Sequence, residues 1–196
     1  NETYRSMMSN TYYVIPPTNK QPEERPLHGQ HQMLNESSLY YYEYAEGGKT
    51  GYTVEAQNTL VTYAKQRDTE LIAVVLKCNG AQHYVDTKAL FDYGFANYQT
   101  VKAFSAADLT QNVAITETYK DKTTTLDTIT AAPASDVYVT IPKNATIENI
   151  TKAVDCPESA SVPVAVGDKL GTVVLSMDGE ALATVDLTAQ KEVKAT

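Results

Sequence analysis

The residues with the clearest chemical potential are a lysine, a threonine and a glycine within segment 47–53, which reads GGKTGYT. On an extended strand, the ammonium of Lys49 and the hydroxyl of Thr50 can both donate hydrogen bonds to a substrate carboxylate. Gly51 leaves room for the backbone of a ligand to lie alongside that strand. A Lys-Thr-Gly tripeptide also arises by chance as a glycine-containing turn. The surrounding sequence must therefore show whether this tripeptide is a functional motif.

The residues Gly48-Lys49-Thr50 also occur at the end of the phosphate-binding loop motif, which is Gly-x-x-x-x-Gly-Lys-Thr between a strand and a helix. The first glycine of that motif would fall at position 43, which is Glu43 in this chain. The residues after Thr53 continue as β-type sequence and do not begin a helix. Both departures argue against a phosphate-binding loop.

The histidines and cysteines fit structural roles better than chemical ones. His28 and His31 form a His-x-x-His pair, but no nearby cysteine or second acidic ligand completes a metal site, so we expect a solvated loop. Cys78 ends an apolar run and is expected to be a core thiol, and Cys156 is far from it in sequence. We therefore predict no metal site and no cofactor.

Composition narrows the class of protein. The 196-residue chain has a net charge of −8 and no run of Lys or Arg, which argues against nucleic acid as a partner because phosphate binding needs clustered cations. We interpret the tyrosine-rich segment 40–44 as packing surface. No apolar stretch approaches the ~20 residues that cross a bilayer. We interpret Asn1, which is not a methionine, as an internal start.

Strands are expected on both sides of a polar turn in the first half of the chain. Their predicted positions are 48–53, 58–64 and 71–78, and the last two should form a hairpin. The continuous apolar run 71–76 predicts a strand that is buried on both faces. Segment 18–32 is polar and proline-containing, which predicts a long loop.

One helix is expected after these strands, over residues 86–96. Its spacing of apolar residues predicts that Leu90, Phe91 and Tyr93 face the sheet. Gly94 is expected to form the C-terminal cap of this helix.

The composition changes after about residue 101, where the chain becomes rich in Thr, Val and Ala. Apolar and polar residues alternate at 113–119 and 172–175, as is typical of strands, and Asp178-Gly179 between two apolar runs is a strong hairpin signal. We therefore predict a second, all-β module at 104–196, which follows a first part at 1–103.

Five segments carry a resemblance to a known family. The chain resembles the C-terminal part of the penicillin-binding, serine-type D-alanyl-D-alanine carboxypeptidases of low molecular mass (peptidase S11). The resemblance covers nearly the whole chain, in the family's order. The segments are 11–18 (TYYVIPPT), 47–61 (GGKTGYTVEAQNTLV), 71–78 (LIAVVLKC), 86–95 (DTKALFDYGF) and 162–174 (VPVAVGDKLGTVV).

The resemblance implies an α+β fold, in which part of a β-lactamase/transpeptidase-like domain, an antiparallel sheet with helices, precedes a small all-β domain that acts as a stalk. It implies hydrolysis of the terminal D-Ala from a peptidoglycan pentapeptide through an acyl-serine intermediate, and binding of β-lactams. It also implies an extracytoplasmic location, at the cell surface or the periplasmic face of a bacterial membrane. The family's amphipathic membrane anchor would lie just beyond Thr196.

The resemblance also assigns roles to single residues. Lys49 matches the catalytic lysine of the family's motif, and Thr50, Gly51 and Thr53 match positions beside the substrate. His83 aligns with an arginine that can hold the substrate carboxylate in many members. A histidine is a weaker cation than arginine, and its charge depends on pH.

The family's nucleophile lies in a Ser-x-x-Lys motif, and a second motif is Ser-x-Asn, but neither occurs in these 196 residues. We therefore expect a fragment that lacks the N-terminal half of the catalytic domain and is inactive alone. Strand 71–76 would then be a hydrophobic open edge, which the N-terminal half or self-association would cover. Two alternatives remain: a non-catalytic cell-wall-associated protein that lost the nucleophile, and a β-lactamase relative, against which the appended β-module argues.

Overall fold

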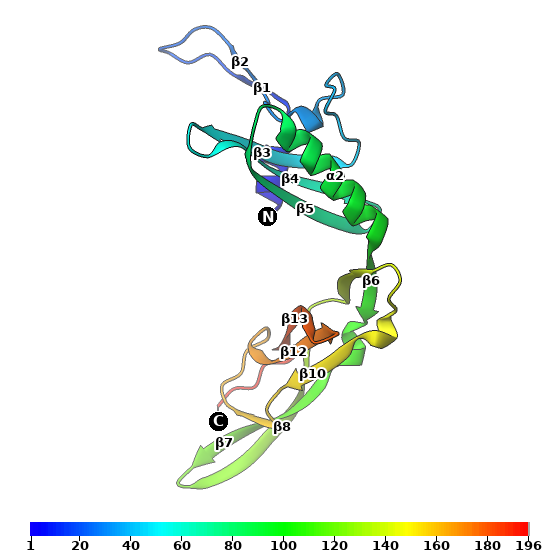
Figure 1. Cartoon of the computed structure of the whole chain (residues 1–196). Helices are drawn as coiled ribbons and strands as arrows, with labels where there is room; N and C mark the ends of the chain where they lie inside the picture. The colour runs from blue at the N-terminus through cyan, green and yellow to red at the C-terminus, as the bar shows by residue number, and fades with distance from the viewer. Residues whose placement is uncertain (196) are drawn as a thin grey trace. The chain divides into compact units, whose positions relative to one another are not determined.

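The alternation of apolar and polar residues is realised as antiparallel strands along most of the chain. The structure, a computed structural model, describes residues 1–195 and divides into two units, Asn1–Gln99 and Thr100–Thr196. Both α-helices belong to the first unit, and the second unit is built from strands and short 3-10 turns (Figure 1). The predicted α+β class is therefore confirmed. Within the described residues, no helix has the length and apolar character that a membrane span requires.

The first unit combines a three-stranded antiparallel sheet, in the order β3-β4-β5, with a separate two-stranded ribbon, β1-β2 (Figure 1). The three predicted strands are confirmed, each with somewhat wider bounds. The elements are α1 (Glu2–Met8), β1 (Tyr12–Ile15), β2 (Arg25–His28), η1 (Gln32–Leu34), β3 (Ala45–Thr53), β4 (Gln57–Gln66), β5 (Thr69–Cys78) and α2 (Gln82–Asn97).

The predicted hairpin joins β4 to β5 through only two residues, Arg67 and Asp68. Gln66 pairs with Thr69 across the turn, and Arg67 has a φ of 56°, in the left-handed region that such tight turns require. Helix α2 then packs across one face of the sheet (Figure 1). The core between them contains Met33, Tyr42, Leu60, Ala64, Ala73, Tyr84, Phe91 and Phe95.

The expectation that residues 71–76 are buried on both faces is wrong for this structure. Ala73 and Val75 are buried against α2, whereas Ile72, Val74 and Leu76 on the opposite face are 70%, 55% and 67% exposed. Helix α2 covers one face, whereas the short α1 contacts mainly β3 and reaches β4 and β5 through Arg5. Among the described residues, β5 pairs with β4 alone. The strand is therefore an apolar edge strand with one open face.

Helix α2 begins four residues earlier than predicted, and two of its three predicted core contacts are wrong. Phe91 is buried, but Leu90 and Tyr93 are 51% and 63% exposed. Gly94 does not cap the helix but lies within it, where a Cβ would come within 2.6 Å of Leu71 Cδ1. The glycine allows close packing of α2 on β5, which fixes a different helix face toward the sheet.

The predicted loop 18–32 contains regular structure at its C-terminal end. β2 pairs with β1 in antiparallel register, from Tyr12 with His28 to Ile15 with Arg25. The tyrosine-rich segment 40–44 forms turns and packs as expected, since Tyr42 stacks on Phe91 with ring centroids 5.6 Å apart.

The second unit contains a six-stranded sheet, in the order β10-β12-β13-β8-β7-β11, and a two-stranded sheet, β6-β9. The predicted hairpin at Asp178-Gly179 is confirmed: both residues have positive φ, 52° and 84°. The elements are β6 (Tyr98–Phe104), η2 (Ala106–Leu109), β7 (Gln111–Tyr119), β8 (Lys122–Ala132), β9 (Val137–Pro142), η3 (Ile147–Asn149), β10 (Thr151–Asp155), β11 (Ser159–Ser161), β12 (Lys169–Met177) and β13 (Glu180–Ala189).

Candidate functional site

Strand β3 carries the Lys-Thr-Gly residues at an edge of the three-stranded sheet, because within residues 1–195 it pairs with β4 alone. Lys49 pairs with Val61 of β4, and Thr50 pairs with Leu60. Because side chains alternate along a strand, Lys49 lies on the face opposite α2 with the half-exposed Val61, and Thr50 lies on the face of the buried Leu60. The ammonium and the hydroxyl therefore flank the edge of β3 from both faces.

A pocket of about 540 Å³ brings four of the five predicted site residues together. Lys49, Thr50 and Gly51 line it from β3, and His83 lines it from the first turn of α2. Thr53 lies outside this pocket, and its Oγ1 accepts a hydrogen bond from a backbone N–H in the turn between β3 and β4, at 3.0 Å. The pocket thus joins a primary ammonium, a hydroxyl and an imidazole, all of which can donate hydrogen bonds to an anion.

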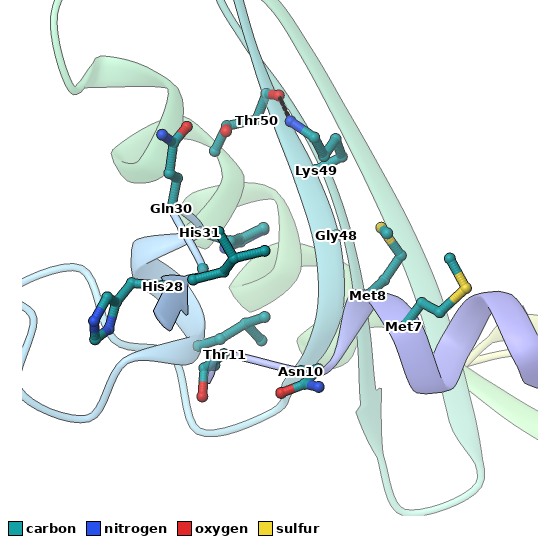
Figure 2. A pocket seen from close by; sticks show the side chains of 13 residues that line it. Met7, Met8, Asn10, Thr11, His28, Gln30, His31, Gly48, Lys49 and Thr50 are labelled. Carbon is teal, nitrogen blue, oxygen red and sulfur yellow. Dashed lines mark hydrogen bonds between the residues drawn. The ribbon is translucent and has the colours of Figure 1, made fainter. Parts of the chain in front are cut away.

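The side chain of Lys49 is exposed and lies along its own strand. Its Nζ donates a hydrogen bond to the carbonyl oxygen of Thr50 at 2.6 Å (Figure 2). No carboxylate in residues 1–195 forms an ion pair with Lys49. Two of the three N–H donors of the ammonium therefore remain for a ligand.

His83 forms a buried part of the pocket wall, with only 6% of the residue exposed. Its Nδ1 lies 3.0 Å from the carbonyl oxygen of Gly80, and its ring centroid lies 4.0 Å from that of Tyr84. These contacts orient the imidazole and engage Nδ1, which leaves Nε2 as the nitrogen that a ligand can reach.

A second pocket, of about 330 Å³, contains a residue whose importance the sequence did not reveal. His31 lines it together with Gly48, Lys49 and Thr50 (Figure 2). The expectation of a solvated loop is wrong for His31, which is 7% exposed, although His28 is exposed as expected. His31 Nε2 lies 2.9 Å from Oγ1 of a threonine 31 residues away on β4. No local pattern could predict so distant a contact.

The environment of His31 favours the neutral imidazole. Burial lowers its pKa to about 4, and the nearby positive charges of His83 and Lys49 act in the same direction. Its Nδ1 is buried and has no hydrogen-bond partner within residues 1–195, so a protonated ring would bury an unsatisfied N–H.

The cysteines are not arranged for chemistry. Cys78 and Cys156 are both free thiols and half-buried, so the expectation of a core position holds only in part for Cys78. Burial, a hydrogen bond to Asp86 and the charge of Asp86 raise the pKa of the Cys78 thiol, which disfavours the reactive thiolate. No cluster of three His, Cys, Asp or Glu residues that could hold a metal ion occurs among the described residues.

Two family models match the chain, and together they cover most of it. The C-terminal domain of penicillin-binding protein 5 matches residues 98–195, and D-alanyl-D-alanine carboxypeptidase (peptidase S11) matches residues 6–80. The first match covers half of the chain, and the second includes the Lys-Thr-Gly strand.

Curated relatives agree with these matches. The D-alanyl-D-alanine carboxypeptidase DacF of Bacillus subtilis is 29% identical over 164 residues, which are 83% of this chain and 41% of the relative. The carboxypeptidase DacA of Haemophilus influenzae is 29% identical over 153 residues, 76% of this chain and 37% of the relative. The chain therefore spans about two fifths of the length of these relatives.

Solved structures share the fold. Penicillin binding protein 5 from Haemophilus influenzae superimposes with a TM-score of 0.63 at 24% identity, over 97% of this chain and 51% of that protein. The peptidoglycan synthesis regulatory factor PBP3 from Streptococcus pneumoniae gives a TM-score of 0.67 at 16% identity, over 98% of this chain and 53% of that protein. With the family matches to both units, these findings show that the chain belongs to the penicillin-binding D-alanyl-D-alanine carboxypeptidases of the peptidase S11 family.

Proposed function

We propose that this chain supplies the substrate-binding strand of a serine-type D-alanyl-D-alanine carboxypeptidase, which removes the terminal D-Ala from peptidoglycan pentapeptides. The observation that carries the proposal is the shared pocket of Lys49, Thr50, Gly51 and His83 at the edge strand β3. A peptide with a free C-terminal carboxylate fits this combination, because the edge offers backbone hydrogen bonds and the side chains offer donors for an anion.

Each residue has a role in this binding mode. The Lys49 ammonium, which has no carboxylate partner in the described part of the chain, neutralises the carboxylate of the terminal D-Ala. The Thr50 hydroxyl donates a second hydrogen bond, and His83 faces the same ligand from α2. Gly51 has no side chain to obstruct a ligand backbone that lies beside β3.

The covalent step requires a serine in the family's Ser-x-x-Lys motif, which does not occur in these 196 residues. In the proposed reaction, that serine attacks the carbonyl carbon of the penultimate D-Ala and displaces the terminal D-Ala, and water then hydrolyses the acyl-serine ester. A β-lactam would acylate the same serine. The residues described here bind and orient the substrate for that attack.

Peptidoglycan lies outside the cytoplasm, so the proposed substrate implies an extracytoplasmic location. The domains follow from the same proposal: residues 1–103 belong to the transpeptidase-like catalytic domain, and the all-β module at 104–196 holds it as a stalk. The open edge of β5 is the surface that the remainder of a catalytic domain, or a second copy of the chain, would cover.

Titration of the 196-residue chain with N-acetyl-D-Ala-D-Ala, followed by NMR, tests the proposed binding site. We expect the backbone signals of Lys49, Thr50 and Gly51 to shift, and Lys49→Ala to abolish those shifts. Lys88→Ala is the matched control, because Lys88 is an exposed lysine on α2 that lines neither pocket of β3. Signals that shift equally in wild type and Lys49→Ala would refute the assignment of Lys49.

A further inference from the structure

The ring of His31 lies against the backbone of Gly48, the residue that precedes Lys49. A Cβ built on Gly48 would come within 2.6 Å of His31 Nε2 and 2.8 Å of its Cδ2. Figure 2 shows His31 beside the part of β3 that carries Gly48 and Lys49. We propose that His31 is a positioning residue, which holds the β3 backbone at Gly48 and thereby the direction of the Lys49 side chain.

The same ring also contacts the neighbouring strand. Its Nε2 lies 2.9 Å from Oγ1 of Thr62, a fully buried residue of β4 that is the direct partner of Gly48 in the sheet. His31 therefore contacts both members of one cross-strand pair. A shift of β3 relative to β4 at this point would break the hydrogen bond or compress the ring against Gly48.

His31 is itself fixed by its surroundings. Its carbonyl oxygen accepts a hydrogen bond from the N–H of Leu34 at 3.1 Å, which places the residue at the start of η1. Met33, two residues further along the chain, is fully buried, and the ring centroid of Tyr84 on α2 lies 6.2 Å from that of His31. A loop residue anchored in this way can transmit the rigidity of the core to the edge strand.

The neutral state of the ring suits this role. A protonated His31 would repel the ammonium of Lys49, whereas a neutral imidazole contributes shape and one hydrogen bond. His31 thus acts through the position of Lys49, and it is not itself a ligand-binding cation. Only this link to a substrate depends on the proposed function; the mechanical link to β3 does not.

Amide hydrogen exchange measures the mechanical link. In His31→Ala, those amides of Gly48, Lys49 and Thr50 that hydrogen-bond to β4 should exchange about fivefold faster than in wild type, since loss of one buried hydrogen bond costs about 1 kcal/mol. His31→Asn, which keeps a side-chain donor, should recover part of the protection. His28→Ala changes the exposed histidine of the same segment and should have no effect.

Core amides of the second unit serve as an internal reference for folding in each variant. If His31→Ala does not fold, the exchange rates of His31→Asn and His31→Gln are compared with wild type instead. Exchange at Gly48, Lys49 and Thr50 that stays at the wild-type rate in folded His31 variants would overturn the positioning role.

Ligand discrimination separates positioning from a general loss of structure. Wild type should bind N-acetyl-D-Ala-D-Ala more tightly than its C-terminal amide, because Lys49 recognises the carboxylate. In His31→Ala this ratio should fall toward one, and His31→Asn should restore part of it. A loss of affinity that is equal for acid and amide would contradict the positioning role. If wild type binds neither peptide, the proposed function fails, and the exchange experiment still decides whether His31 holds β3.

Discussion

Gly48 of β3 and Val61 of β4 approach each other so closely that a Cβ on Gly48 would collide with the carbonyl oxygen of Val61. The obstacle is backbone, so it cannot move aside as the end of a flexible side chain can. The glycine before Lys49 is therefore required by the packing of the sheet.

Gly48→Ala should destabilise the first unit by about 1–3 kcal/mol, the usual cost of overpacking a well-packed site. Gly47→Ala is the matched control, because a Cβ there meets only Met8 at 3.4 Å or more, which is ordinary contact. Urea unfolding followed through signals of the first unit provides the comparison. Equal stability of the two variants would show that the sheet can relax around Gly48.

The stability of the first unit should fall on acidification in two separate windows. His31 has a native pKa of about 4, below the ~6.5 of an unfolded chain, so between these values only the unfolded state binds the proton. Stability should therefore decrease as the pH falls from about 6.5 to 4. The Glu70 pKa is lowered to about 2 by hydrogen bonds from Arg5 and Lys65, so its contribution is lost below about 4.5.

His31→Asn should flatten the pH dependence of the unfolding free energy between pH 6.5 and 4.5. Glu70→Gln should change only the dependence at lower pH, and His28→Asn should change neither window. Unfolding free energies measured at pH 7, 5.5, 4.5 and 3 test both windows. An unchanged slope in His31→Asn would mean that the native His31 is not held neutral.

The apolar open face of β5 should promote self-association of the isolated chain. Ile72, Val74 and Leu76 are all more than half exposed on a strand whose outer edge has no partner in residues 1–195. Val74→Lys should shift the chain toward the monomer in sedimentation experiments. Val166→Lys, at a 66% exposed site in the second unit, is the control. A wild-type chain that stays monomeric at high micromolar concentration would refute this prediction.

Sequence patterns predicted those parts of the fold that local interactions determine. The β4–β5 hairpin and the Asp178-Gly179 turn each follow from a few adjacent residues, and both were correctly predicted. The side chains of α2 that face the sheet were not correctly predicted, because the close packing of Gly94 on Leu71 determines which side chains contact the sheet. The open face of β5 was missed because an apolar run does not reveal how many layers cover it.

In the candidate site too, local sequence features were predicted and contacts between distant residues were not. Lys49, Thr50 and Gly51 stood out as a tripeptide, and the family resemblance gave them and His83 their roles. The four residues line one pocket, and their roles in binding stay a prediction. His31 was missed because its burial depends on Thr62, which lies on another strand. A short His-x-x-His pair contains no information about that strand.

Acylation by a fluorescent penicillin tests the central claim most directly. The 196-residue chain alone should remain unlabelled, and it should become labelled when combined with a family segment that contains Ser-x-x-Lys and Ser-x-Asn. In that complemented protein, Lys49→Ala should slow acylation on the order of 10²–10³-fold, the usual effect of losing one preorganised charge, and Lys88→Ala should not. Labelling of the chain alone, or acylation of Lys49→Ala at the wild-type rate, would contradict the account.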